Sequence, residues 1–328
     1  MTFKYNNVYI NETSTITGPF EKEGPLKKFF DKSYKDFYFG CKNFDEAESK
    51  ILLDSVNLLL KKISKNKKDI DLFISGDLLN QITSSNFAAR ELKIPYLGIF
   101  NACATSTEGL LIASNMIEAG QINNAICSVS SHNNAAEKQF RYPVEYGGPK
   151  PKTTTFTVTG GASAYLSNEK KNIKIESATI GRVVDMGISD AYAMGAVMAP
   201  AFADTLVTHL KETKRDIDYY DLILSGDLGK YGREIVIDYM KQEYNIKLNN
   251  YNDTACMIYD INKQPVFSGG SGPACAPLVT YSYVFDLMKN KKIKKVLLIA
   301  TGSLHSQTSV NEKRTIPSIA HAISLEVL

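Results

Sequence analysis

The chain has 328 residues, of which 44% are hydrophobic and 22% are charged, with a formal net charge of +3. This composition is typical of a soluble globular protein and excludes a disordered chain, while the length suits one large domain or two fused ones. The lysine runs at 61–68 and 289–295 are interpreted as solvated helix ends that lead into strands, so no nucleic-acid partner is expected. No stretch is apolar enough to span a membrane, and no secretory leader is expected.

The first clear unit begins with a short apolar strand at 71–78 that ends in a Ser-Gly-Asp turn. A helical pattern at 86–92, an apolar run at 94–100, a long helix near 107–119 and a strand at 125–129 follow. Cys103 lies between the apolar run and the long helix. A cysteine where a strand turns into a helix lies beside backbone N–H groups and the positive helix end, which favour thiolate over thiol. Cys103 is therefore the candidate nucleophile.

A polar, turn-rich segment at 133–155 interrupts the pattern, and its length predicts a lid, a binding loop or an interface. The order of elements then returns. The string DLFISGDL at 71–78 reappears as DLILSGDL at 221–228, an offset of 221 − 71 = 150. A helix near 233–241, a glycine-rich turn at 268–272, a helix near 274–290 and a strand at 296–300 follow it. This repetition predicts one pseudo-symmetric α/β domain, closed by β segments at 157–166, 173–180 and 318–327.

Cys103 needs a base if it is a nucleophile, and the chain has only four histidines. His209 lies among charged residues of a predicted helix and is expected at the surface. His321 is expected to be a satisfied residue of a core strand. His132 and His305 each follow a strand, at the edge where such folds place ligands. Both are open to the alternative that they are bonded to nearby backbone.

The scattered cysteines form no C-x-x-C pair, so neither a zinc site nor a disulfide framework is predicted. Reduced thiols, a cytoplasmic fold and no cofactor are expected. The five are Cys41, Cys103, Cys127, Cys256 and Cys275.

A duplicated α/β half with a cysteine before the first long helix resembles the thiolase superfamily, in particular the beta-ketoacyl-ACP synthase III branch, over roughly residues 46–328. The resemblance implies duplicated βαβαβ halves layered α-β-α-β-α, with Cys103 at the nucleophile position. It also implies a histidine after the second-half strand and an Asn or His in the glycine-rich turn. The chain has Ser-Gly-Asp at 225–227 and Gly-Gly-Ser at 269–271 instead. Claisen-type chemistry would lose a base and oxyanion donors, each commonly worth about 100-fold or more.

The strings at 74–81, 103–106 and 130–148 resemble one group within this superfamily, the stage V sporulation protein AD family of spore-forming bacteria. Its members look like thiolases that keep the cysteine and lack the catalytic partners. The resemblance implies a non-catalytic protein that binds dipicolinic acid, with calcium as a possible companion. It also implies transport into the developing spore with other stage V sporulation A membrane proteins, a peripheral place at the spore inner membrane, and a possible homodimer.

Dipicolinate is a flat dianion, so its pocket needs N–H or cationic donors and a flat apolar wall. The helix end behind Cys103 and the backbone of the glycine-rich turn are expected to supply the donors. Arg141 or Lys152 would add charge and Phe140 or Tyr142 the wall, unless they pack the lid or an interface. The expected ligand-binding residues are Cys103, Ser131, His132, Asn133, Arg141, Gly270 and Ser271, with no resident metal.

The expected organisation is an N-terminal extension with the first strands at 1–45, a first half at 46–180 with the lid loop at 133–155, and a second half at 181–328. Two other functions stay open. In one, the protein is an active acyltransferase or ketoacyl synthase in which Cys103 is acylated and His132 or His305 is the base. In the other, it is a scaffold whose lid loop docks a membrane partner. The apolar stretch at 191–203 could serve the core or an interface.

Overall fold

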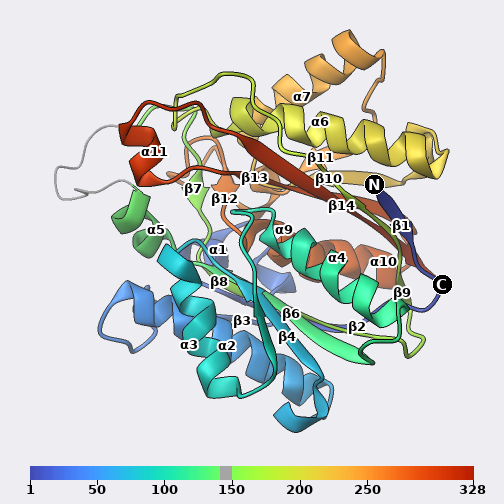
Figure 1. Cartoon of the computed structure of the whole chain (residues 1–328). Coiled ribbons are helices and arrows are strands. Elements are labelled where there is room, and N and C mark those ends of the chain that lie inside the picture. Colours follow the sequence, from blue (N-terminus) through green and yellow to red (C-terminus); the bar gives the residue numbers. More distant parts are fainter. Residues whose placement is uncertain (141–149) are drawn as a thin grey trace.

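The computed structural model describes residues 1–140 and 150–328 (Figure 1). Its centre is one 12-stranded sheet, with β1 (Thr2–Lys4) paired to β9 and β3 (Lys32–Ser33) paired to β2 at its side. The main path runs β11 (Tyr251–Asp253), β10 (Leu222–Ser225), β13 (Lys295–Ser303), β14 (Ser318–Val327), β9 (Ile173–Ile180), β2 (Tyr9–Thr17), β8 (Gly160–Ser167), β6 (Asn124–Ser131), β4 (Leu72–Gly76) and β5 (Tyr96–Gly98).

The two ends of this path have the same construction. Strands β5, β4 and β6 are parallel and continue into antiparallel β8 and β2. Strands β11, β10 and β13 are likewise parallel and continue into antiparallel β14 and β9. The strand order thus has the duplicated halves that the repeat predicts. It groups β9 with the second half, although the expected boundary at residue 180 leaves that strand in the first.

The helices lie in three layers around the two half-sheets. In Figure 1, α2 and α3 cover the outer face of the first half, α6 and α7 cover the second, and α4 lies between them with α9 and α10. The layered α-β-α-β-α fold is therefore confirmed. The bounds are α1 (Pro19–Glu23), α2 (Phe44–Lys62), α3 (Thr83–Leu92), α4 (Thr105–Glu118), α5 (Asn133–Phe140), α6 (Met194–Thr213), α7 (Gly229–Tyr244), α8 (Ala255–Ile258), α9 (Cys275–Val279), α10 (Phe285–Lys289) and α11 (Gln307–Asn311).

Local sequence explains the outer helices. Asn43 caps α2, because its side chain accepts a hydrogen bond from the Glu46 backbone N–H at 2.9 Å. The buried face of α2 then repeats at helical spacing through Ile51, Leu52 and Val56. The apolar stretch at 191–203 leads into and forms the first half of α6, where most side chains are buried against β13 and β14, so it belongs to the core.

The helix expected near 274–290 is confirmed as one helical run, in which a π-helical turn at 280–284 joins α9 to α10. Two local expectations are wrong. The segment expected as a loop from residue 133 begins with a helix, α5, before the undescribed residues 141–149. His209 is fully buried rather than exposed, because its ring lies between the Thr179 and Tyr220 hydroxyls at 2.7 and 2.6 Å.

A short second sheet pairs β7 (Phe156–Thr157) with β12 (Gly270–Ser271) and ties the glycine-rich turn to the chain that follows the undescribed residues. No helix in the described part of the chain has both the length and the apolar character needed to cross a bilayer.

Candidate functional site

The turn that carries Cys103 runs from the end of β5 to the start of α4 and is tightly folded. Ala102 has a φ of +50°, the left-handed region that a non-glycine residue rarely adopts. The Thr105 hydroxyl holds this conformation, because it accepts from the Asn101 N–H at 3.0 Å and donates to the Ala102 carbonyl at 2.6 Å. Cys103 is half-buried at the apex of this turn.

Strand β13 brings the second half against this turn. A Cβ on Gly302 would collide with the Asn101 carbonyl oxygen, so only glycine lets the two backbones approach so closely. The next residue back, Thr301, donates its hydroxyl hydrogen bond to the Gly226 carbonyl. One strand therefore holds the cysteine turn on one side and the Ser-Gly-Asp turn after β10 on the other. Asp227 consequently lies beside Cys103.

Asp227 is the unexpected member of the site. Its side chain is fully buried, its φ is +70°, and neither carboxyl oxygen has a hydrogen bond of ordinary geometry. Burial raises the pKa of this carboxyl well above its usual range, and nearby Asp253 raises it further. The Cys275 thiol and the Gly272 N–H oppose that rise only in part. Burial therefore favours the protonated, uncharged form of Asp227.

The Cys103 thiol is also uncharged. Burial raises its pKa well above the usual value for cysteine, and the Asp227 carboxyl adds to the rise, while the Gly272 N–H lowers it. The expectation that a helix end at this position favours the thiolate is therefore wrong in direction. Cys103 precedes α4 by two residues, and burial next to an acid outweighs the helix end.

The glycine-rich turn offers one donor rather than the expected nest. Gly270 and Ser271 form β12 and pair with β7, and Gly270 is buried against Ile258 and Val158. Gly272 follows with a φ of +100°, and its N–H is the group that faces the Cys103 thiol and the Asp227 carboxyl.

His132 does not pair with Cys103. It is fully buried among Phe37, Phe39 and Phe44, with ring centroids 6.0, 5.6 and 5.3 Å away. Its Nε2 lies 2.8 Å from the Phe37 carbonyl oxygen, and burial lowers its pKa. These are the contacts of a neutral core histidine bonded to backbone.

The neighbours of His132 have structural hydrogen bonds as well. The Ser131 hydroxyl donates to the Val158 carbonyl at 2.7 Å and packs against the Gly272 Cα, where an added Cβ would lie 2.8 Å from it. The Asn133 N–H donates to the Thr159 hydroxyl at 3.0 Å, whereas its side-chain nitrogen has no partner. Ser131 thus adjoins the site through Gly272. Arg141 and Tyr142 lie outside the described residues.

The other two histidines near the site are neutral too. His321 has both ring nitrogens occupied, by the Gly181 N–H and the Asn101 side-chain amide at 3.2 Å each, and burial lowers its pKa to about 4. The expectation of a satisfied core residue is confirmed. His305 contacts the Ser303 hydroxyl at 3.0 Å and the Phe140 ring, and burial lowers its pKa.

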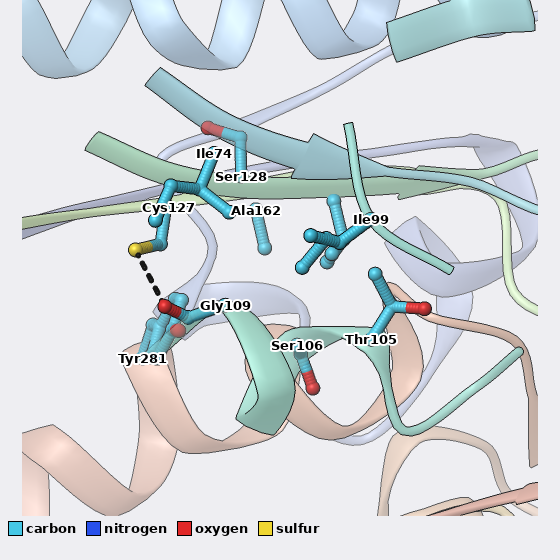
Figure 2. A pocket seen from close by; sticks show the side chains of 10 residues that line it. Ile74, Ile99, Thr105, Ser106, Gly109, Cys127, Ser128, Ala162 and Tyr281 are labelled. Carbon is cyan, nitrogen blue, oxygen red and sulfur yellow. Dashed lines mark hydrogen bonds between the residues drawn. The ribbon is translucent and has the colours of Figure 1, made fainter. Parts of the chain in front are cut away.

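Two cavities flank the cysteine turn. Behind it, a cavity of only about 10 Å³ lies between α4 and the first half-sheet, where Cys127 donates to the Gly109 carbonyl (Figure 2). That volume holds at most one water molecule. In front, a groove of about 360 Å³ has room for a small ligand and is lined from both halves. Its lining is 78–82, 98–100, 139–140 and 305–307.

Phe100 and Phe140 give this groove flat apolar surface, and Phe100 is followed directly by the cysteine turn. No group of three or more His, Cys, Asp or Glu side chains suited to a metal ion occurs within residues 1–140 and 150–328.

Sequence reasoning places the turns that carry Asp227 and Gly272 at the site, but it gives the Asp227 side chain no role and misses Cys275 as a neighbour of Cys103. The repeat itself contained a signal for Asp227, since it is the second-half equivalent of Asp77 at an offset of 150. Nothing in the string predicts that one aspartate is bonded and the other is not.

Comparison with known proteins identifies relatives along the whole chain. The family model described as "Stage V sporulation protein AD" matches residues 1–326. The stage V sporulation protein AD of Bacillus subtilis (strain 168) is 45% identical over 319 residues, which cover 97% of this chain and 94% of that protein.

Solved structures with the same fold are much more distant in sequence. A variant of OleA from Xanthomonas campestris has a TM-score of 0.62 at 13% identity and covers 99% of both chains. The 3-oxoacyl-[acyl-carrier-protein] synthase III of Aquifex aeolicus VF5 has a TM-score of 0.56 at 13% identity, covering 99% of this chain and 100% of that one. At such low identity these likenesses establish the thiolase-like fold alone.

Proposed function

The chain belongs to the stage V sporulation protein AD family, and on this premise we propose that it is a non-catalytic binding protein for dipicolinic acid. In this role it hands the ligand to the other stage V sporulation A membrane proteins for uptake into the developing spore. The observation that carries the non-catalytic part is the position of a fully buried carboxyl group, Asp227, beside Cys103.

Acyl transfer by Cys103 needs a thiolate and a group that takes the thiol proton. Burial favours the protonated form of Asp227, which cannot take the thiol proton, and its charge, where present, would oppose a thiolate. Asp253 is the next carboxyl, with a pKa raised by burial to about 6, but its oxygens accept hydrogen bonds from the turn around it. The residues around the thiol therefore support binding better than nucleophilic attack.

The same residues suit a small flat dianion. The Gly272 N–H provides a donor beside Cys103, the positive end of α4 lies close by, and the groove provides aromatic surface from Phe100 and Phe140. In the proposed pocket Cys103 is a small polarizable wall, Ser131 and Ser271 lie beside Gly272, and Asn133 stays a predicted contact. His132 and Gly270 support this pocket from the core, and Arg141 stays a predicted contact. Calcium, if it enters, is expected as part of the ligand chelate.

Lysines at the opposite end of β13 support a peripheral place at an anionic membrane. The turn before β13 exposes Lys291, Lys292 and Lys294, and the turn before β9 exposes Lys170 and Lys171. Both turns meet the end of the chain, through the bonds from the 327 N–H to the 294 carbonyl and from the 328 N–H to the 172 carbonyl. Each such lysine adds about 1 kcal/mol of attraction to an anionic surface.

The membrane proposal is tested with Lys292→Glu and Lys294→Glu combined. Binding to vesicles of phosphatidylglycerol and phosphatidylcholine should weaken at least tenfold, because two attractive charges become repulsive. If the variant and wild type sediment with the vesicles to the same extent, these lysines do not bind the membrane and this part of the proposal is wrong.

A homodimer is part of the proposal as well. β5 lies at the end of the sheet path and pairs only with β4 among the described strands. Near this edge Leu97 and Phe100 are 41% and 47% exposed. An open edge strand with exposed apolar side chains suits pairing with a second copy. Light scattering of the purified protein measures its mass directly.

The function itself is tested by calorimetric titration with dipicolinate, with and without calcium, on wild type and Cys103→Leu. We expect saturable binding by wild type and at least tenfold weaker binding by the variant, because the larger side chain fills the cleft. No binding by wild type would contradict the proposal. Mass spectrometry after incubation with acetyl-CoA tests the alternative acyltransferase activity. An acyl group on Cys103 that then turns over would identify an acyltransferase.

A further inference from the structure

Asp227 and its repeat equivalent have the same local sequence and different partners. Asp77 ends the first Ser-Gly-Asp turn, and both of its carboxyl oxygens are bonded, to the Leu79 N–H at 2.9 Å and the Ser85 N–H at 2.7 Å. These bonds tie β4 to the start of α3. Asp227 has no such bond, although its side chain is equally buried.

In the second half, Asp253 rather than Asp227 makes the corresponding hydrogen bonds to the backbone. Its carboxylate accepts hydrogen bonds from the Leu228 N–H at 3.2 Å, the Gly229 N–H at 3.0 Å and the Ala255 N–H at 3.1 Å, as well as the Ser225 hydroxyl at 2.6 Å. The amides that follow β10 are therefore satisfied without Asp227.

The left-handed φ of Asp227 is a conformation that costs an ordinary side chain energy. It places the carboxyl with Cys103, Cys275 and the Gly272 N–H. Buried polar side chains without a partner are rare in folded proteins, and each needs an explanation such as a ligand.

Burial favours the uncharged form of Asp227, and the side chains that face it bring no positive charge that would reverse this. They are Cys103 from the turn before α4, Cys275 from the start of α9 and Asp253 from the end of β11, and none of them is a cation. An ionised carboxylate here would repel an anionic ligand. A protonated one has an O–H that can donate to it.

We propose that Asp227 is a ligand-binding residue whose carboxylic acid donates a hydrogen bond to a carboxylate of the bound ligand. This inference rests on the proposed function, because it takes the ligand to be a small dicarboxylate held at Cys103. The Gly272 N–H is the second donor on the same side. The thiolase resemblance implies a base in this turn. Asp227 stands there instead, as an acid that binds the ligand.

The proposal predicts how binding depends on pH. Affinity is retained while Asp227 is protonated and is lost as the pH rises through its raised pKa, because the donor disappears and a repelling charge takes its place. Asp227→Asn keeps an N–H donor of the same shape and tolerates the left-handed backbone. Asp227→Gly removes the side chain and suits the positive φ even better.

The experiment is calorimetric titration of both variants and wild type with metal-free dipicolinate between pH 6 and 10, with circular dichroism as the folding control. Asp227→Asn should bind within a few-fold of wild type at pH 6 and lose the alkaline decline. Asp227→Gly should bind at least tenfold more weakly at pH 6. Asp221→Asn is the control, because this aspartate lies at the opposite end of β10, where it accepts from the backbone N–H groups of residues 294 and 295, and its substitution should leave affinity unchanged.

Binding by folded Asp227→Gly at wild-type affinity would overturn the inference. Equal losses in the Asn and Gly variants would overturn it as well, because the ligand would then need the carboxylate itself. In both results wild type still binds, so the proposed function stands. Absence of binding by wild type would instead refute the proposed function.

Discussion

The two halves repeat an aspartate at each end of the same strand, and the two ends have diverged differently. At the start, Asp71 accepts from the backbone N–H groups of residues 123 and 124, and Asp221 accepts from those of residues 294 and 295. At the other end, Asp77 is fully bonded and Asp227 is not. The duplication is therefore conserved in structure where it frames the sheet and altered where the second half faces Cys103.

The difference shows that an aspartate can stay buried in the fold although another residue makes the hydrogen bonds that hold its turn. Asp253 provides the hydrogen bonds that the second turn needs. Asp227 is then held beside a thiol, where its protonated form is favoured by burial. An enzyme of this fold would need a proton acceptor at that point, whereas a binding protein for an anion needs a donor.

The largest expected effect comes from removing Asp253. Asp253→Ala should lower the free energy of unfolding by about 3–5 kcal/mol, because three buried N–H groups and one hydroxyl lose their acceptor. Urea denaturation followed by circular dichroism measures the loss. A change below about 1 kcal/mol would mean that the second turn does not depend on Asp253.

The direct comparison of the two acids is expected to give an intermediate effect. Asp77→Asn should cost about 1–3 kcal/mol of folding stability, because an amide nitrogen faces a backbone N–H that needs an acceptor. Asp227→Asn should change stability by less than about 0.5 kcal/mol at pH 6, since no hydrogen bond of ordinary geometry is lost and the amide oxygen still faces the Gly272 N–H. Thermal and urea unfolding of both variants test this, and similar losses would break the comparison.

The smallest effect is expected at the strand starts. Asp71→Ala and Asp221→Ala should each cost about 1 kcal/mol, because each removes an exposed carboxylate that accepts two backbone N–H bonds. The two losses should agree within about 0.5 kcal/mol in urea denaturation. A large difference between them would show that the repeat is no longer equivalent at this end either.

Much of the fold could be predicted from the sequence. The 150-residue offset gives equivalent strands in β4 and β10, and apolar runs place β6 and β13 correctly within a few residues. Cys103 is found at the predicted strand-to-helix turn. These features depend on local pattern and on repetition, which a single sequence displays.

The side-chain environments could not be predicted in the same way. His132 is buried by three phenylalanines from residues 37–44, a segment whose place in the fold has no local signal. His209 shares its helix with the charged residues Lys211 and Glu212 and yet bonds to Tyr220 in the core. The difference in hydrogen bonding between Asp77 and Asp227 depends on the φ of Asp227 and on Asp253, which lies 26 residues further along the chain (253 − 227 = 26).

The protonation state of Asp227 is the central claim, and carboxyl carbon NMR measures it most directly. In protein labelled with carbon-13 at the aspartate carboxyl, the Asp227 signal is assigned as the one that Asp227→Gly removes. The account predicts the shift of a protonated acid at pH 7, both free and with dipicolinate bound, and ionisation only at higher pH. A carboxylate shift at pH 7 that persists when dipicolinate is added would contradict it.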